Sequence, residues 1–357
     1  MFRPIILLFP ALITLLSGCA NLSGKAVEGT RINYNVAIQK TADQQLLLNL
    51  VRLRYRDTPY FIEISSISSQ LSYRANANAN TTLGPDVDNV GIGAGVQYTE
   101  TPTISYAPLQ GDEFVTRVLS PISLEQLILL SNSGWSLSRI MRVCVQRINN
   151  LKNAPSASGV TPDLAPVYRD FNNLTGLLRT LQQQDALSLG YEVRNKQTIP
   201  VLRLDAAAGD VRTVKNVRQA LNLHQSDTYE LVNTPVNNRN NIIQINTRSL
   251  LGVLYYLSQS TDVPQSHKDS GKVTITKYKD GRLFDWHDVT RDLFRIQHSV
   301  TPPTQAAIAI FYRGYWFYID DADLESKSTF SFLSQLFALQ AGKTESIKPV
   351  LTLPVGQ

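Results

Sequence analysis

Residues 307–320 read AIAIFYRGYWFYID, and this stretch predicts a β-hairpin. Two runs of apolar and aromatic residues flank Arg313-Gly314, a two-residue turn with a glycine available for positive φ. Because side chains alternate along a strand, the expected register places Phe311, Trp316 and Tyr318 on one face. The other face carries Ile308, Ile310, Tyr312, Tyr315, Phe317 and Ile319.

Amphipathic helices are predicted on both sides of this hairpin in the sequence. After it, Phe330, Leu333 and Leu336 recur at helical spacing between Ser328 and Ala341. The same spacing predicts helices at residues 42–55, 171–181, 214–221 and 250–257. Helices and short strands alternate irregularly, so we expect an α+β fold with short antiparallel strands and hairpins.

Other elements are predicted from capping residues and alternation. Asp112 and Ser123 are suitable N-caps for helices that reach Leu119 and Leu130. Strands are expected at residues 60–73, 96–109, 242–245, 273–278 and 350–353, and longer helices at residues 136–151 and 285–296. The Asn-Ala repeats and the glycines of residues 75–92 predict a flexible loop or an extended polar arm.

The first residues have the pattern of an export signal. Arg3 precedes an apolar run, Ile5–Leu16, which is too short to cross a membrane. Leu16-Ser17-Gly18-Cys19 resembles the lipobox of bacterial lipoproteins. That resemblance implies cleavage before Cys19 and acyl chains, such as palmitate, on this residue. Ala20 in the next position implies sorting to the outer membrane, with the chain facing the periplasm.

Composition limits the domain organisation. We expect a signal peptide at residues 1–18, a lipidated tether at 19–33, an α+β subdomain at 34–152 and a second one at 163–357. The Pro-, Ser- and Gly-containing segment 153–162 is the predicted boundary. The charged fraction of 18% is ordinary for a folded protein.

The charge pattern argues against nucleic-acid binding, and the cysteine content argues against a disulfide. The net charge of +5 is scattered and forms no basic run, so nucleic-acid binding is not expected. The chain has two cysteines, and lipidation of Cys19 leaves Cys144 alone, which excludes an intramolecular disulfide. Cys144 lies in an apolar stretch and is predicted to be a buried small hydrophobe.

Two short motifs approach catalytic signatures without completing them. Gly111-Asp112-Glu113-Phe114 is similar to the loop of diguanylate cyclases, but Gln110 replaces the preceding glycine, and a capped helix start explains the acids. Gly134-Trp135-Ser136-Leu137-Ser138 lacks the final glycine of a nucleophile elbow and has no strand before it. Ser136 is therefore interpreted as a helix cap.

No metal or cofactor site is predicted. Asp320, Asp321, Asp323 and Glu325 lack the spacing and the central glycine of a calcium loop, and we interpret them as helix caps. The four histidines are scattered, without the i,i+4 pairing of a metal site. His287 stands among Asp288, Arg291, Asp292 and Arg295, which indicates a solvated helix face.

The aromatic face of the hairpin, formed by Phe311, Trp316 and Tyr318, allows two interpretations. An open face could stack on sugar rings or contact a protein partner, because Trp and Tyr supply large contact area at low entropic cost. Alternatively, the helix from Ser328 covers this face and both faces are core. The alanines opposite favour the second interpretation.

Longer segments resemble a family of bacterial envelope lipoproteins. They are Leu50–Tyr55, Pro102–Tyr106, Arg313–Asp321 and Pro349–Pro354. The resemblance spans most of the mature chain. It implies location in the cell envelope and gives no indication of the mechanism.

Three functions remain open from the sequence. The first is a non-enzymatic, lipid-anchored scaffold or accessory subunit of an outer-membrane complex, with an envelope protein as partner. The second is a glycan- or peptidoglycan-binding module that uses Phe311, Trp316 and Tyr318. The third is a periplasmic hydrolase with a site assembled from distant residues. The scaffold is expected because no catalytic motif was found.

Overall fold

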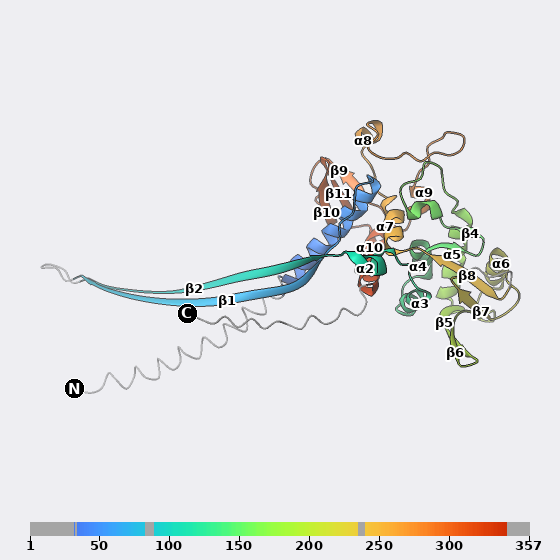
Figure 1. Cartoon of the computed structure of the whole chain (residues 1–357), viewed down its shortest axis with the longest axis horizontal. Helices are drawn as coiled ribbons and strands as arrows, with labels where there is room; N and C mark the ends of the chain where they lie inside the picture. The colour runs from blue at the N-terminus through green and yellow to red at the C-terminus, as the bar shows by residue number, and fades with distance from the viewer. Residues whose placement is uncertain (1–31, 33, 83–88, 235–239, 341–357) are drawn as a thin grey trace. The chain divides into compact units, whose positions relative to one another are not determined.

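A computed structural model gives the fold and describes residues 32, 34–82, 89–234 and 240–340. The α+β class is confirmed, because the described chain combines helices with three sheets of antiparallel or mixed strands (Figure 1). The chain forms two compact units: residues 60–114 are one, and the segments on either side of them form the other. This division differs from the predicted boundary at 153–162.

The 60–114 unit is a two-stranded antiparallel ribbon. Strand β1 (Ile62–Thr82) pairs with β2 (Asn89–Pro108) along its whole length, interrupted by one irregularity between Ile64 and Ser66 (Figure 1). At about 3.3 Å per residue, the ribbon is about 65 Å long. The predicted strands at 60–73 and 96–109 therefore pair with each other, and the described parts of the arm predicted at 75–92, residues 75–82 and 89–92, continue the same two strands. Helix α2 (Gly111–Phe114) ends the unit.

A six-stranded sheet organises the larger unit, in the order β4-β3-β8-β7-β6-β5. All neighbouring pairs are antiparallel except β7 and β8. Buried and partly exposed residues alternate along β7 and β8, so one face of the sheet packs on the core. The strands are β3 (Val145–Ile148), β4 (Leu151–Lys152), β5 (Leu187–Arg194), β6 (Gln197–Leu204), β7 (Thr228–Val232) and β8 (Ile242–Thr247).

Amphipathic helices supply the apolar surface that this sheet needs. Helix α5 (Arg169–Gln183) contacts β4, β5 and two other helices, α4 (Leu137–Cys144) and α6 (Val211–Leu221). The side chains that α5 buries, from Phe171 to Leu181, have the spacing predicted from the sequence. Helix α3 (Leu124–Asn132) begins at Ser123, whose hydroxyl accepts a hydrogen bond from the Gln126 N–H in a capping box, as expected.

Helix α7 (Leu250–Ser258) lies in the interior. It is apolar around most of its circumference and buries seven of its nine residues, which is typical of a central core helix. It contacts α4, the π-helical turn η1 (Val115–Leu119) and the 3-10 turn η2 (Pro155–Ser158). The core is therefore built around α7, and η2 lies within the predicted linker 153–162. That segment is packed in the core, with Asn153 and Ala157 buried.

A three-stranded sheet forms the C-terminal part, in the order β10-β11-β9. Its strands are β9 (Gln297–Ser299), β10 (Ala306–Tyr312) and β11 (Tyr315–Asp320), followed by helix α10 (Leu324–Gln340). The predicted hairpin register is confirmed, with Tyr312 opposite Tyr315 and Phe311 opposite Trp316. Arg313 and Gly314 both take positive φ, of 50° and 87°. An N-terminal helix (residues 34–54) packs beside this sheet, and Gln44 donates a hydrogen bond to the Ala309 carbonyl.

Three predicted elements are wrong in extent. The helix expected at 136–151 ends at Cys144, because Val145–Ile148 pairs with β8 instead. The helix expected at 285–296 is the short α9 (His287–Thr290), followed by Asp292 at φ 58°, a value that ends a helix. The strand expected at 273–278 forms only isolated bridges at Lys277. The strand expected at 350–353 lies outside the described residues.

No helix in the described part of the chain combines the length and the apolar character required to span a membrane. The predicted signal peptide and lipidated tether, including Cys19, also lie outside the described residues.

Candidate functional site

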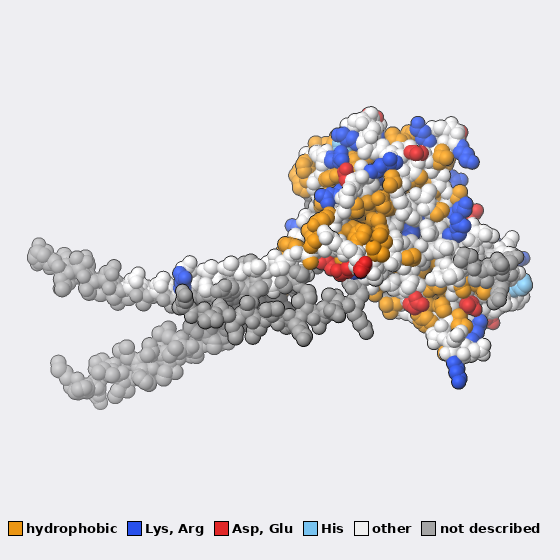
Figure 2. Space-filling view, viewed as in Figure 1, with side chains coloured by type: hydrophobic (Ala, Val, Ile, Leu, Met, Phe, Trp, Pro, Cys, Tyr) orange, Lys and Arg blue, Asp and Glu red, His pale blue; other side chains and the backbone are white. Residues whose placement is uncertain are grey.

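The aromatic face of the C-terminal hairpin is open. Phe311 on β10 is 58% exposed, and Trp316 and Tyr318 on β11 are partly exposed. The rings of Phe311 and Trp316 are tilted against each other with centroids 5.4 Å apart. In Figure 2, hydrophobic side chains cover the outer side of the region where Figure 1 draws β10 and β11. The prediction that the following helix covers this face is wrong.

The opposite face of the same sheet is the buried one. Phe317 and Ile319 are fully buried, and Ile310 is nearly so. The end of the N-terminal helix packs there, with the Tyr55 ring edge-on to Phe317 at 6.1 Å. One apolar face is thus enough to join the hairpin to the core, which leaves the aromatic face available.

Polar groups border the aromatic face. Strand β9 pairs with β11 so that Gln297 lies opposite Tyr318 and Ser299 opposite Trp316. The Tyr318 hydroxyl donates a hydrogen bond of 3.1 Å to Gln297 Oε1. Rings that can stack, next to amide and hydroxyl groups that can donate and accept, are the combination that sugar binding requires.

Behind this sheet lies a histidine–tyrosine cluster that the sequence did not predict. Tyr55 Oη lies 2.7 Å from Nδ1 of the buried His267. The Tyr315 ring stands edge-on to His267 at 5.1 Å and to His298 at 5.9 Å. Burial lowers the pKa of both histidines, so they are predominantly neutral at pH 7. The cluster therefore joins the helix end to the sheet without adding charge.

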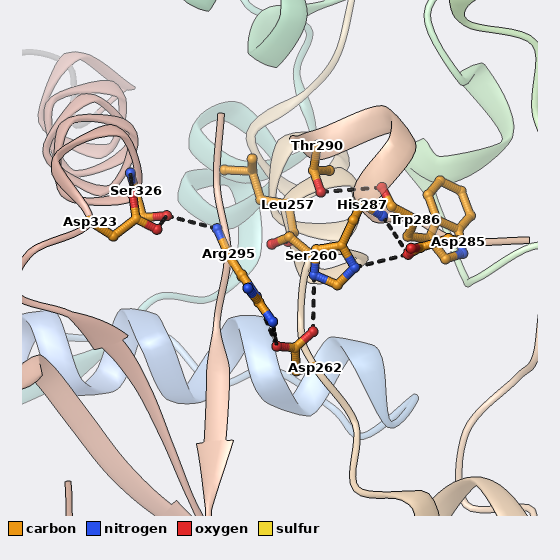
Figure 3. A network of polar contacts seen from close by, with 10 residues as sticks. All are labelled: Leu257, Ser260, Asp262, Asp285, Trp286, His287, Thr290, Arg295, Asp323 and Ser326. Atoms are coloured by element: carbon orange, nitrogen blue, oxygen red, sulfur yellow. Dashed lines mark hydrogen bonds and ion pairs between the residues drawn. The ribbon is translucent and has the colours of Figure 1, made fainter. Parts of the chain in front are cut away.

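A polar network surrounds His287 (Figure 3). Its ring points to Asp262 through Nε2, at 3.0 Å, and to Asp285 through Nδ1, at 2.9 Å. Arg295 forms an ion pair of 2.8 Å with the second oxygen of Asp262. The backbone N–H of Arg295 donates a hydrogen bond to the hydroxyl of Ser326 on α10. The prediction that His287 lies on a solvated helix face is wrong, because these partners half-bury it.

The charged contacts of this network shift the pKa values of its members. The Asp262 contact raises the pKa of His287 despite its burial. Burial raises the pKa of Asp262, but the His287 and Arg295 contacts outweigh burial and lower it. A general base needs a ring nitrogen facing the substrate, and both nitrogens of His287 face carboxylates. The Ser260 hydroxyl, which Figure 3 places nearby, donates to the Leu257 carbonyl. The network thus links α9 to Asp262 in the segment after α7 and, through Arg295, to α10.

The acids at the start of α10 act as caps and ion pairs. Asp323 accepts hydrogen bonds from the backbone N–H and the hydroxyl of Ser326. Asp321 pairs with Lys327, and Glu325 pairs with Arg139. Within the described ranges, no group of three His, Cys, Asp or Glu side chains could hold a metal ion.

The two near-motifs also have structural roles. Gly111, at φ 62°, begins α2, whose first turn holds Asp112 and Glu113. Ser136 occupies the N-cap position of α4 but makes no capping hydrogen bond through its side chain. Instead, Gln182 accepts a hydrogen bond from the first N–H of that helix.

Cys144 is a buried free thiol, as predicted. Burial raises its pKa, so the reactive thiolate is suppressed.

A shallow groove of 370 Å³ lies on another part of the surface. The guanidinium of Arg282 stacks over the Tyr278 ring at 5.2 Å. The same guanidinium forms an ion pair of 2.8 Å with Asp280. No histidine lines the groove. Its walls are Pro166, Val167, Tyr168, Arg169, Asp170, Tyr278 and Arg282.

No protein-family model matches the chain, and neither a curated protein nor a solved structure matches it significantly.

Proposed function

We propose that this protein is a lipid-anchored scaffold of the cell envelope that joins a larger assembly through its β1–β2 ribbon. Acyl chains on Cys19 hold it on the outer membrane, and the folded unit faces the periplasm. The ribbon is the observation that carries the proposal. The motif Leu16–Cys19 supports the anchor.

The ribbon lacks the neighbouring strands that normally stabilise a β-sheet in water. Twenty residue pairs join β1 and β2, and no third strand of the described chain pairs with either of them. A two-stranded hairpin is at best marginally stable alone, and an open strand edge is a template for pairing with another chain. A long exposed ribbon is therefore best explained as a contact element.

A pull-down from native membranes tests the scaffold. The tagged, lipidated protein is extracted in mild detergent, and the captured proteins are identified by mass spectrometry. The matched control replaces residues 65–105 by Asn-Gly. We expect a stoichiometric envelope protein with the full chain and none with the control. Capture of the same companions by both proteins would contradict the role of the ribbon.

The anchor is tested separately. Labelled palmitate should be incorporated into the full chain, and Cys19→Ser should abolish both the label and partition into the detergent phase. A Cys19→Ser protein that remains membrane-bound would contradict the proposed anchor.

A second candidate function is glycan binding at the aromatic face. It is supported by the 58% exposure of Phe311 and by the hydrogen bond between Tyr318 and Gln297 beside it. Co-sedimentation with isolated peptidoglycan sacculi is the test. Phe311→Ala should weaken binding at an unchanged melting temperature. Val211→Ala, which removes a still more exposed side chain on α6, should not.

A further inference from the structure

We infer that copies of this chain join head to tail through the ribbon, the β1 edge of one copy pairing with the β2 edge of the next. This deepens the proposed scaffold function and rests on it, because it names the partner of the ribbon as a second copy. The backbone, the sequence pattern and the charges of the two strands support it independently.

The outer edges of both strands lack the usual protection. Natural sheets block a free edge with proline, lysine or inward-pointing charge. Between Ser69 and Thr82, β1 contains no proline or lysine. Strand β2 has Pro102 and Pro108 near its base and none between Asn89 and Thr101. The distal half of the ribbon is thus open to pairing at both edges, over about 13 residues or about 44 Å.

The two strands have the same alternation of polarity. The described side chains Ser72, Arg74, Asn76 and Asn78 of β1 are exposed and lie opposite Thr99, Gln97, Gly95 and Gly93 of β2. Every one of these positions is polar or glycine. The residues between them in the sequence are Tyr73, Ala75 and Ala77 in β1 and Ala94, Val96 and Tyr98 in β2.

This shared alternation makes the ribbon complementary to itself. Because side chains alternate along a strand with a period of two, a β1 strand matches any β2 strand of this sequence with like faces aligned. The residues involved are mostly Ala, Asn, Gly and Thr, which offer little that would select a foreign side chain. A second copy is therefore the occupant that these edges fit.

Charge disfavours pairing between identical strands. Arg74 is the one charged residue of β1 between Ser69 and Thr82, and Glu100 is the one charged residue of β2 between Asn89 and Thr101. Arg74 pairs with Gln97 and Glu100 pairs with Leu71, so aligning like faces of β1 and a neighbour's β2 brings no like charges together, whereas β1 with β1 places two arginines on one face. The β1-to-β2 arrangement also uses both edges of every copy. Such a heterologous contact either closes into a ring or extends as a filament.

Disulfide trapping between differently tagged copies tests the inference. One full-length, lipidated chain carries Asn76→Cys, and the other carries Gly93→Cys, Gly95→Cys, Gln97→Cys or Thr99→Cys. Directly opposed residues of neighbouring strands meet the distance that a disulfide requires. A Cβ added at Gly93 or Gly95 meets no atom within 4 Å, so these changes fit the ribbon. Cys144 is buried and does not interfere.

We expect a reducible dimer of the two tags, formed in native membranes, for at least one of the four combinations. Asn76→Cys with Val211→Cys, an exposed position on α6, should give none. Failure of all four combinations would overturn the inference, and so would a dimer that Asn76→Cys forms only with itself. If the pull-down still finds a foreign companion that needs the ribbon, the scaffold function stands without self-pairing. Trapped copies without any companion would instead restrict the scaffold to self-assembly.

Discussion

Arg248 shows how a single buried charge can be held without a carboxylate. The side chain is 1% exposed, and its guanidinium donates to carbonyl oxygens of Arg142, Val143, Val145 and Asn153. The first two are in the last turn of α4, where helix carbonyls lack partners and carry partial negative charge. The guanidinium therefore caps α4. Burial lowers the pKa of Arg248 to about 10, which leaves it charged at pH 7.

Replacing Arg248 should therefore destabilise the whole unit. Arg248→Met leaves several buried carbonyl groups without a donor, and each such group costs about 1–3 kcal/mol. We expect a loss of at least about 3 kcal/mol in the free energy of unfolding, measured by urea denaturation. Arg282→Met, on an exposed side chain, is the control and should change it by less than about 0.5 kcal/mol. Equal losses for the two variants would refute the capping role.

His287 should make stability depend on pH. Its pKa is raised in the folded state, so its contribution is fully present below about pH 6.5, the ordinary histidine value, and is lost as pH rises through the raised pKa. The pKa values of Asp262 and Asp285 are lowered, so their contributions disappear as pH falls through those values in acid. The network is thus strongest in mildly acidic solution.

The measurement is the melting temperature between pH 5.5 and pH 9. We expect the wild-type chain to lose more stability toward high pH than His287→Gln, because the variant has no ionising group between the two carboxylates. Asp262→Asn, which removes one partner and leaves Arg295 unpaired, should flatten the profile in the same range. Parallel profiles for the wild type and His287→Gln would exclude this linkage.

At the scale of the element, the two faces of the C-terminal hairpin supply a matched pair of substitutions. Phe317 is fully buried and Phe311 is mostly exposed, although they lie on adjacent strands of the same sheet. Phe317→Ala should cost about 3–5 kcal/mol, as is usual for a core phenylalanine. Phe311→Ala should cost less than about 1 kcal/mol. Thermal or urea unfolding distinguishes them, and similar losses would mean that the aromatic face is covered.

Elements that depend on local sequence were predictable, and those that depend on distant partners were not. The register of the C-terminal hairpin follows from the turn at Arg313-Gly314, because a two-residue turn leaves little freedom. The end of α4 depends on β8, about 100 residues further along the chain, which competes for Val145–Ile148. No local sequence pattern indicates that competition, so the predicted helix was too long.

The candidate sites follow the same rule. Alternation placed Phe311, Trp316 and Tyr318 on one face correctly, but it could not show which face the core covers. The partners of His287 could not be predicted completely either: Asp285 is two residues away, but Asp262 is brought in from the segment after α7. Segment 153–162 has a linker composition, yet its Asn153 carbonyl binds Arg248, a contact that composition does not reveal.

At the scale of the whole molecule, the ribbon is inserted into the other unit at a single place in the chain. Both ends of the insertion lie close together, because Ile62 is paired with Pro108 and Ile64 with Tyr106. The segments on either side of residues 60–114 form one compact unit. We therefore expect the larger unit to fold without the distal ribbon, and the assembly function to be lost with it.

The variant that tests this expectation replaces residues 65–105 by Asn-Gly, which closes Ile64 and Tyr106 with a type I′ turn. Because it removes none of the core residues of the larger unit, its melting temperature should stay within about 3 °C of the full chain, the shift that about 1 kcal/mol produces at this size. The far-ultraviolet spectrum should lose strand signal and keep helix signal. A variant that fails to fold would mean that the ribbon stabilises the larger unit, and a folded variant that still assembles would remove the ribbon from the proposed function.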